Sequence, residues 1–216
     1  MGRYNLLDEK WIQVLLKNGG GTQKVSLKEV FSNAGDYYDL AGEMKTQDFA
    51  VLRVLLAVLQ TVFSRFDSEG NPYDFLEIDK ETFTQKEPAD WEDLDDEDPF
   101  FETWLSLWEK GNFPEIVQEY LEAWRDRFYL FDDKYPFYQI TSEQMKELVE
   151  KSSKGEYGTR IYGKNLNRTI SENAHKIAMF APITGKAEDK DKLCDDQLAR
   201  WLIMYQGYSG AAEKRR

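Results

Sequence analysis

The chain has 216 residues, of which 41% are hydrophobic and 14% aromatic, a composition too rich in large apolar side chains for a disordered protein. Its formal net charge of −12 argues against a general nucleic-acid binder, because nonspecific affinity for phosphates comes from clustered Lys and Arg. A single cysteine, Cys194, excludes an internal disulfide and any cysteine-rich metal cluster.

The first segment predicts short strands. Apolar and polar residues alternate over residues 4–16 around Trp11, which is typical of a strand. The glycine-rich turn at 18–21 would return the chain as a hairpin partner at 23–27, and a further extended piece is expected at 39–42. The first residues lack the apolar core of a signal peptide, so we expect a cytoplasmic protein.

Two helices are expected next. Ser26 and Glu29 have the spacing of a capping box, which predicts a short helix through Phe31. The clearest helix begins near Thr46 and runs to about Arg65, because leucines recur at helical spacing. These leucines are Leu52, Leu55, Leu56 and Leu59. Valines add apolar surface beyond this stripe, so we expect the helix to be nearly surrounded by protein. Polar residues interrupt its apolar run, so no membrane span is expected.

An acidic segment follows this helix. Between Asp67 and Glu109 there are sixteen acidic residues against two lysines. We interpret residues 67–99 as an acidic insertion. Its run at 93–98 favours a solvated surface over a metal site, because it lacks the spaced Gly and terminal Glu of a calcium loop.

The remaining elements are helices, one turn and a long loop. Helices are predicted at 100–110, 113–128, 142–151 and 195–206, and glycines at 111 and 207 would end the first and the last. A short extended run at 128–131 leads into a turn at 132–137. Residues 152–192 are predicted to form a long loop with one short strand at 176–180.

Motifs for catalysis are missing from the sequence. His175 is the only histidine, and neither it nor Cys194 lies in a recognisable catalytic signature. The sequence contains no phosphate-binding loop, dinucleotide fingerprint or nucleophile elbow. We therefore expect a binding protein that is not an enzyme and needs no metal or cofactor.

Two segments are candidates for binding. Residues 151–176 carry six basic against two acidic residues, and residues 157–169 combine basic, aromatic and amide side chains. Such a set suits phosphates and unpaired bases, although an ordinary solvated loop has the same composition. Glycines in 207–210 would let the backbone approach a groove closely, or would simply end a helix and form a turn.

Four segments in order along the chain resemble CasA, the large-subunit family of type I-E CRISPR Cascade complexes. These segments are residues 4–12, 40–48, 131–139 and 198–210. The resemblance implies an α+β fold in which 1–216 is an N-terminal domain of small strands and hairpins packed by several helices. The family's C-terminal helical bundle would lie beyond residue 216.

The resemblance also implies a function and partners. The family recognises the short PAM beside a double-stranded DNA target, contacts the end of the CRISPR RNA, joins other Cascade subunits and later helps recruit a helicase–nuclease. Its DNA-contacting glycine loop maps onto Gly207, Tyr208, Ser209 and Gly210. Its RNA-contacting loop maps onto the region from Asn167, Arg168 and Thr169 to Phe180, with Phe180 as the aromatic anchor.

Two other hypotheses stay open at this point. The chain is alternatively a scaffold or regulatory protein that binds only proteins through its aromatic surface. It is also compatible with a hydrolase whose site has no recognisable motif. Copurification with a small RNA and several subunits favours the first reading, protein alone favours the scaffold, and turnover favours the hydrolase.

Overall fold

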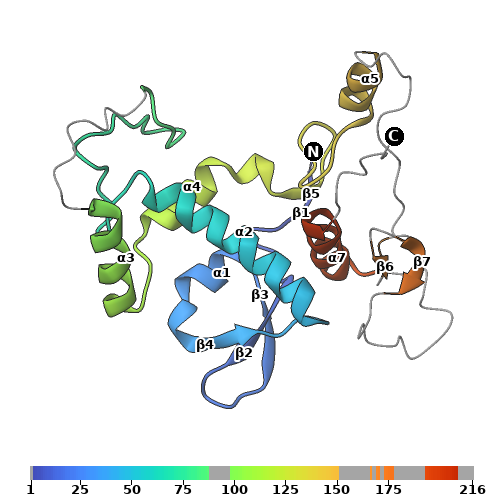
Figure 1. The fold of residues 1–216 in the computed structure, drawn as a ribbon, viewed down its shortest axis with the longest axis horizontal. Helices are drawn as coiled ribbons and strands as arrows, with labels where there is room; N and C mark the ends of the chain where they lie inside the picture. The colour runs from blue at the N-terminus through green and yellow to red at the C-terminus, as the bar shows by residue number, and fades with distance from the viewer. Residues whose placement is uncertain are drawn as a thin grey trace, which may run out of the picture.

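The computed structural model describes residues 2–87, 98–150, 166, 169–170, 173–177 and 193–208. Short antiparallel strands and several helices form the expected α+β fold. In Figure 1, α2 (Lys45–Phe63) crosses the middle of the molecule, with α3 (Pro99–Lys110) near one end and α7 (Asp195–Tyr208) near the other. Helix α7 packs directly on α2, which brings residues 195–208 against the N-terminal part of the chain.

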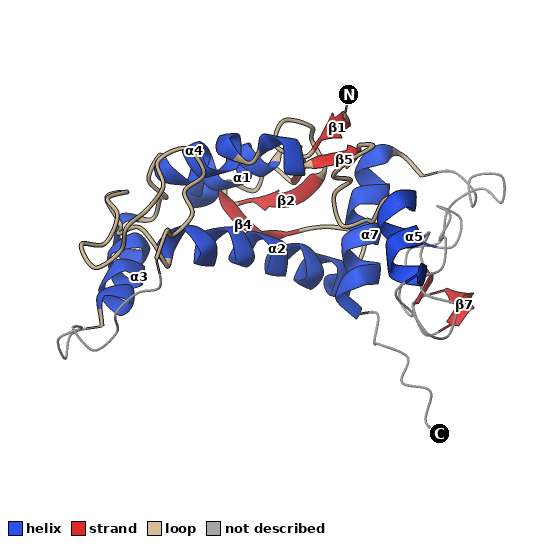
Figure 2. Ribbon diagram, turned by 90° about the horizontal axis from the view of Figure 1, so that it is seen from above, coloured by secondary structure: helices blue, strands red, loops and turns tan. Residues whose placement is uncertain are grey.

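The N-terminal sheet has the strand order β3-β2-β4 and is antiparallel throughout. Its strands are β2 (Ile12–Leu16), β3 (Thr22–Val25) and β4 (Tyr37–Leu40). The predicted hairpin is confirmed by the pairing of Ile12 with Val25. Figure 2 shows this sheet with α2 on one side and α1 (Leu27–Ser32) and α4 (Ile116–Ala123) on the other.

The expected single strand over 4–16 is wrong. Its first part is a separate strand, β1 (Arg3–Asn5), which pairs with the distant β5 (Tyr129–Phe131). The chain turns between β1 and β2 because the Asn5 side-chain oxygen accepts the amide of Leu7 at 2.9 Å. The indole of Trp11 then donates to the carbonyl of Leu6, also at 2.9 Å, which closes the turn.

The capping box is confirmed. The Ser26 hydroxyl accepts from the amide of Glu29 at 3.1 Å, and the Glu29 carboxylate accepts from the amide of Ser26 at 2.8 Å. Helix α1 begins at the next residue, and the short helix η1 (Ala34–Asp36) connects it to β4.

Helix α2 is present, but the expectation that protein nearly surrounds it is wrong. Its valine side faces the core, and the pair Leu55 and Leu59 is buried. The other two leucines of the expected stripe, Leu52 and Leu56, remain 40% and 48% exposed. Although α2 is long and apolar enough to cross a membrane, 56% of its most apolar window is buried inside the fold, as in the core helix of a folded domain.

Helix α3, which follows the acidic segment, has clear caps at both ends. Asp98 accepts the amides of Phe100 and Phe101 and so begins α3, which ends at Gly111 with φ of +67°. The helix expected at 113–128 is shorter, because the chain leaves the helical path after α4 and forms η3 (Arg125–Arg127). Helix α5 (Ser142–Glu150) agrees with its prediction. Residues 88–97, in the second half of the proposed acidic insertion, lie outside the described part.

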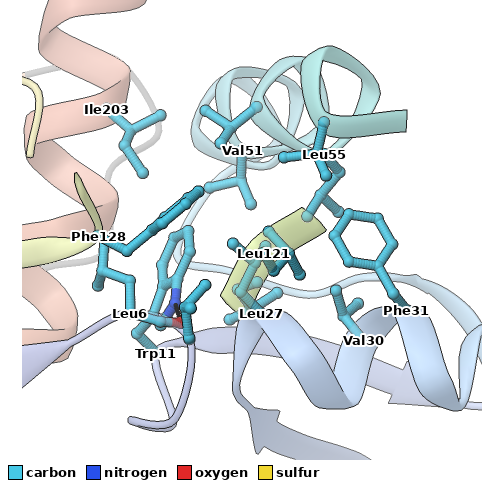
Figure 3. Packing of buried hydrophobic residues seen from close by; sticks show 14 of the residues in the cluster. Leu6, Trp11, Leu27, Val30, Phe31, Val51, Leu55, Leu121, Phe128 and Ile203 are labelled. Carbon is cyan, nitrogen blue, oxygen red and sulfur yellow. Dashed lines mark hydrogen bonds between the residues drawn. The ribbon is translucent and has the colours of Figure 1, made fainter. Parts of the chain in front are cut away.

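One hydrophobic core joins these elements. Figure 3 shows Trp11 among side chains from α1, α2, α4 and α7, with Leu6 and Phe128 beside it. Trp11, Leu6 and Leu121 are all at most 1% exposed. Each fully buried large side chain of this kind stabilises the fold by about 1.5–3 kcal/mol. The core therefore holds α7 against the N-terminal segment, beginning with the first turns of this helix.

Candidate nucleic-acid interface

Helix α7 carries the start of the glycine segment and is fixed by a buried arginine. The Arg200 side chain is 3% exposed, and its guanidinium donates to the carbonyl of Trp11 at 2.5 Å and to Asp196 at 3.0 Å. The second terminal nitrogen of the Arg200 guanidinium, Nη2, lies 3.6 Å from the Glu43 carboxylate. This carboxylate also accepts the indole N–H of Trp201 at 3.1 Å. A buried guanidinium needs such partners, since an uncompensated charge in the interior costs several kcal/mol.

Asp196 is the second charged group of this cluster. Burial alone would raise its carboxyl pKa, but the Lys24 ammonium at 2.6 Å and the Arg200 guanidinium outweigh burial, and the pKa lies below its usual value. The pKa of the half-buried Tyr4 phenol is shifted in the opposite direction, because burial and then the negative charge of Asp196 raise it. Asp196 therefore stays ionised near neutral pH and balances Arg200.

The C-terminal end of α7 rests on two other parts of the fold. The Arg53 guanidinium on α2 donates to the carbonyl of Gly207 at 3.3 Å, which satisfies one of the open carbonyls at the helix end. The Gln206 amide donates to the carbonyl of Tyr138 at 3.3 Å. The last turn of α7 is thus held by α2 and by the turn after β5.

The four segments that carry the family resemblance meet around α7. Trp11 comes from the first segment, Glu43 from the second, Tyr138 from the third, and the α7 side chains from the fourth. Each contact between them is a hydrogen bond given above. The sequence pattern therefore corresponds to one spatial unit, although its parts lie up to about 200 residues apart in the chain.

The second segment also folds tightly on itself. The Asp48 carboxylate accepts the amide of Gly42 at 2.7 Å, and the Gln47 side chain accepts the amide of Glu43 at 3.0 Å. A Cβ at position 42 would lie 2.6 Å from the Asp48 oxygen and 2.8 Å from the Gln47 oxygen. Only glycine fits here without displacing two buried side chains, and this contact fixes Glu43 opposite Arg200.

The structure places the predicted DNA residues only in part. Gly207 and Tyr208 form the last turn of α7, so the expectation that the helix ends at Gly207 is wrong. Its continuation follows from long-range support, because α7 packs on α2 up to this point and Arg53 holds the Gly207 carbonyl. Tyr208 is 39% exposed. Ser209 and Gly210 lie outside the described residues.

Most of the residues predicted to contact RNA fall in the part of the chain that the structure does not describe. Asn167, Arg168 and Phe180 lie outside the described residues. Thr169 belongs to β6 (Thr169–Ile170) and pairs with Ile177 of β7 (Asn173–Ile177). The strand expected at 176–180 therefore begins earlier, at Asn173. Leu166, directly before Asn167, is 6% exposed and belongs to the core.

The buried arginine and its partners were not predicted from the sequence. The spacing of Asp196 and Arg200, four residues apart in a helix, was the available signal. The same spacing is common on solvated helix faces, and the deciding partners Trp11 and Glu43 come from distant parts of the chain. Among the described residues, His, Cys, Asp and Glu form no group of three or more that could hold a metal ion.

Comparison with known proteins decides the family. The family model of the CRISPR-associated protein Cse1 matches residues 5–216. The chain belongs to the Cse1 family. Within this family, the CRISPR-associated protein CasA/Cse1 of Thermus thermophilus is 30% identical over 139 residues, which cover 64% of this chain and 21% of that protein.

Solved structures show the same fold. Cse1 from Thermobifida fusca superposes with a TM-score of 0.57 at 21% identity, covering 94% of this chain and 29% of that one. A chain of a CRISPR RNA-guided surveillance complex, in a pre-nicking state, superposes with a TM-score of 0.58 at 13% identity, covering 95% and 34%. The chain thus spans between a fifth and about a third of these Cse1-like proteins.

Proposed function

We propose that this chain acts as the N-terminal domain of the large subunit of a CRISPR RNA-guided surveillance complex in the cytoplasm. There it helps recognise the PAM and target double-stranded DNA, contacts the CRISPR RNA end, and supports recruitment of the helicase–nuclease. It works by binding and positioning, with no bond-making groups of its own. The observation that supports this most is the match of the Cse1 family model over residues 5–216.

The end of α7 suits a role at a DNA groove. A minor groove offers a degenerate pattern of donors and acceptors, so a close backbone reads its shape permissively while guide pairing reads the sequence. A Cβ at Gly207 would meet the Ala50 Cβ at 3.5 Å and the Arg53 guanidinium at 3.9 Å, which are ordinary contacts. The fold therefore tolerates a methyl group at position 207, and this methyl would lie against α2, so Gly207→Ala should leave duplex binding unchanged where a side chain at Gly210 weakens it.

This difference provides the test. The complex is reconstituted with Gly207→Ala or Gly210→Asp, and binding of a labelled PAM duplex is measured by electrophoretic shift. For Gly210→Asp we expect at least tenfold weaker duplex binding with an unchanged thermal midpoint of the chain. Gly35→Ala is the control, because its Cβ would lie 3.4 Å from the carbonyl of Gly111 and far from α7 in sequence. Equal duplex binding by wild type and both variants would contradict the DNA assignment.

The RNA assignment has its own test. Phe180→Ala should weaken docking of the subunit onto the ribonucleoprotein, and charge removal at Arg168 should do the same through lost phosphate contact. Docking is measured by size-exclusion chromatography with CRISPR RNA present. Full docking of the Phe180→Ala variant would remove Phe180 as the anchor and leave the DNA assignment intact.

An apolar groove favours the protein-binding alternative. It lies between β4 and α2, has a volume of about 450 Å³, and leaves Tyr38, Phe49 and Leu56 at 75%, 54% and 48% exposure. Exposed apolar side chains gathered at a groove are typical of protein-binding surfaces. Copurification separates the two functions, since a scaffold retains protein partners after ribonuclease treatment and carries no small RNA.

A further inference from the structure

A second pocket lies between η3, the turn after β5 and the start of α5. It has a volume of about 260 Å³, and its lining contains Arg127 and Lys134, the two tyrosines Tyr135 and Tyr138, and no carboxylate. The pocket between α1 and α4 has the opposite character, since four glutamates line it with one lysine. In a chain with a net charge of −12, a pocket lined by cations and tyrosines without acids suits an anion with an aromatic part.

Arg127 is preorganised at this pocket. Its guanidinium carbon lies 3.4 Å from the centre of the Tyr135 ring and 5.8 Å from that of Trp124. Stacking fixes the plane of the guanidinium and leaves its N–H edges for a planar or tetrahedral anion. Within the described part of the chain, Arg127 makes no side-chain hydrogen bond and only a 3.9 Å ion pair with Asp126. The neighbouring Arg125, by contrast, is fully engaged by Asp8 and Glu122.

Lys134 supplies the second positive charge. Its ammonium lies 4.9 Å from the centre of the Tyr135 ring, and it forms no ion pair within 4 Å among the described residues. The Oδ1 atom of the adjacent Asp132 carboxylate accepts the amides of Lys134 and Tyr135 at 2.8 and 2.9 Å. These two bonds fix the turn that presents Lys134.

Tyr138 adds an exposed aromatic face and connects the pocket to α7. Its backbone has φ of +56°, a conformation that is uncommon for a residue with a side chain, and the residue is 43% exposed. The ring packs against Phe137 with centroids 4.8 Å apart. Its carbonyl accepts from Gln206, the residue before Gly207. The strained turn is thus held against the same helix end that carries the candidate DNA residues.

We propose that this pocket binds single-stranded nucleic acid, with a phosphate between Arg127 and Lys134 and the adjacent unpaired base on the Tyr138 ring. Arg and Lys donors bind phosphate oxygens, and an exposed tyrosine stacks on any base. A duplex does not fit, because its bases are already stacked and paired. The proposal adds a contact to the proposed function but does not depend on which residues touch the PAM.

The test measures binding of a fluorescein-labelled 12-nucleotide oligouridylate to the purified chain by fluorescence anisotropy at low salt. The double variant R127Q/K134Q should raise the dissociation constant at least tenfold and make its salt dependence shallower. Tyr138→Leu should weaken binding about tenfold, the loss expected for one base stack. The control K17Q/K80Q removes the same two charges at exposed positions outside the pocket and should change affinity less than twofold. Thermal melting of each variant checks the fold.

The competing ligands give the remaining outcomes. Comparing the affinities for oligouridylate and oligodeoxyuridylate shows whether the 2′-hydroxyl of RNA contributes to binding. Tighter binding of either single strand than of a duplex of equal length supports the proposed pocket. Equal or tighter binding of an oligoglutamate peptide would overturn the proposal in favour of an acidic protein. No measurable binding by the wild type, or equal loss in the control variant, would also overturn it. If the purified chain does not bind oligouridylate while the complex binds the PAM duplex normally, the pocket proposal is wrong and the proposed function is unaffected.

Discussion

Arg200 and Asp196 lie one helical turn apart on α7 and form a 3.0 Å ion pair inside the fold, with side chains only 3% and 11% exposed. The pair is not isolated, because Glu43 and the carbonyl of Trp11 complete the shell of the guanidinium. One nitrogen, Nε, is buried without a hydrogen-bond partner among the described residues. This arrangement orients α7 on the N-terminal segment more specifically than apolar packing would.

Removing the Arg200 charge should therefore destabilise the chain strongly. Arg200→Met keeps most of the volume but leaves Glu43 and Asp196 buried with fewer partners, which costs about 3–5 kcal/mol. Urea unfolding should show a lower midpoint with an unchanged slope. Arg3→Met is the matched control, because Arg3 is 67% exposed in its 3.1 Å pair with Asp195 and should cost at most about 1 kcal/mol. Equal midpoints for the two variants would contradict the role of Arg200.

Gly42 should be sensitive to a single methyl group. In Gly42→Ala the new Cβ would lie 2.6 Å from the Asp48 carboxylate, and Asp48 and Gln47 are both buried and unable to move freely. We expect a loss of about 1–3 kcal/mol in the free energy of unfolding. Gly35→Ala, with ordinary spacing around its Cβ, should change stability by less than about 0.5 kcal/mol. Thermal unfolding of the two variants makes the comparison.

Local signals predicted the local structure well. The capping box at Ser26, the C-terminal cap at Gly111 and the hairpin around residues 18–21 all depend on neighbours within a few positions, and all are confirmed. The family resemblance also identified the four segments that meet at α7. Helix caps and tight turns can be predicted in this way because they depend on the type and spacing of residues within a few positions.

Long-range contacts explain what the sequence analysis missed. Helix α7 continues past Gly207 because Arg53, 154 positions away, holds its carbonyl. Strand β1 separates from β2 because β5 offers it a partner. The Arg127 and Tyr138 pocket depends on the packing of three elements, so its residues read in sequence as an ordinary turn. The spacing of its leucines predicted α2 as a helix. Because apolar residues lie on both the leucine and the valine side of this helix, the sequence did not show which side is buried.

The two sides of α2 can be separated by neighbouring leucines. Leu55 is 8% exposed in the core, whereas Leu56 is 48% exposed at the groove. Leu55→Ala should cost about 2–4 kcal/mol, since it leaves a cavity. Leu56→Ala removes the same atoms from a half-exposed position and should cost less than about 1 kcal/mol. Denaturant unfolding of both variants checks the assignment, and similar losses would show that something covers the groove in solution.

The network around Glu122 should give stability that depends on pH. Hydrogen bonds from Arg125, at 2.7 and 3.0 Å, and then from Lys28 lower the Glu122 pKa from its ordinary 4.5 to about 2. A carboxyl with a lowered pKa in the folded state stabilises the fold above its unfolded pKa, and this stabilisation disappears as the pH falls from about 5 to about 2. Because the Glu122 side chain is 40% exposed, water and salt screen the gain, which we expect to be only about 1 kcal/mol.

Glu122→Gln tests this dependence. The difference in unfolding free energy between wild type and variant should be about 1 kcal/mol at pH 7 and should fall toward zero as the pH approaches 2, where the Glu122 carboxyl begins to lose its charge in the folded state as well. High salt should reduce the difference at pH 7, since the pairs lie at the surface. Glu119→Gln is the control on the same helix, because Glu119 forms no ion pair within 4 Å among the described residues. A difference for Glu122→Gln that stays constant from pH 7 to pH 2 would mean that packing, and not the ion pairs with Arg125 and Lys28, accounts for its effect.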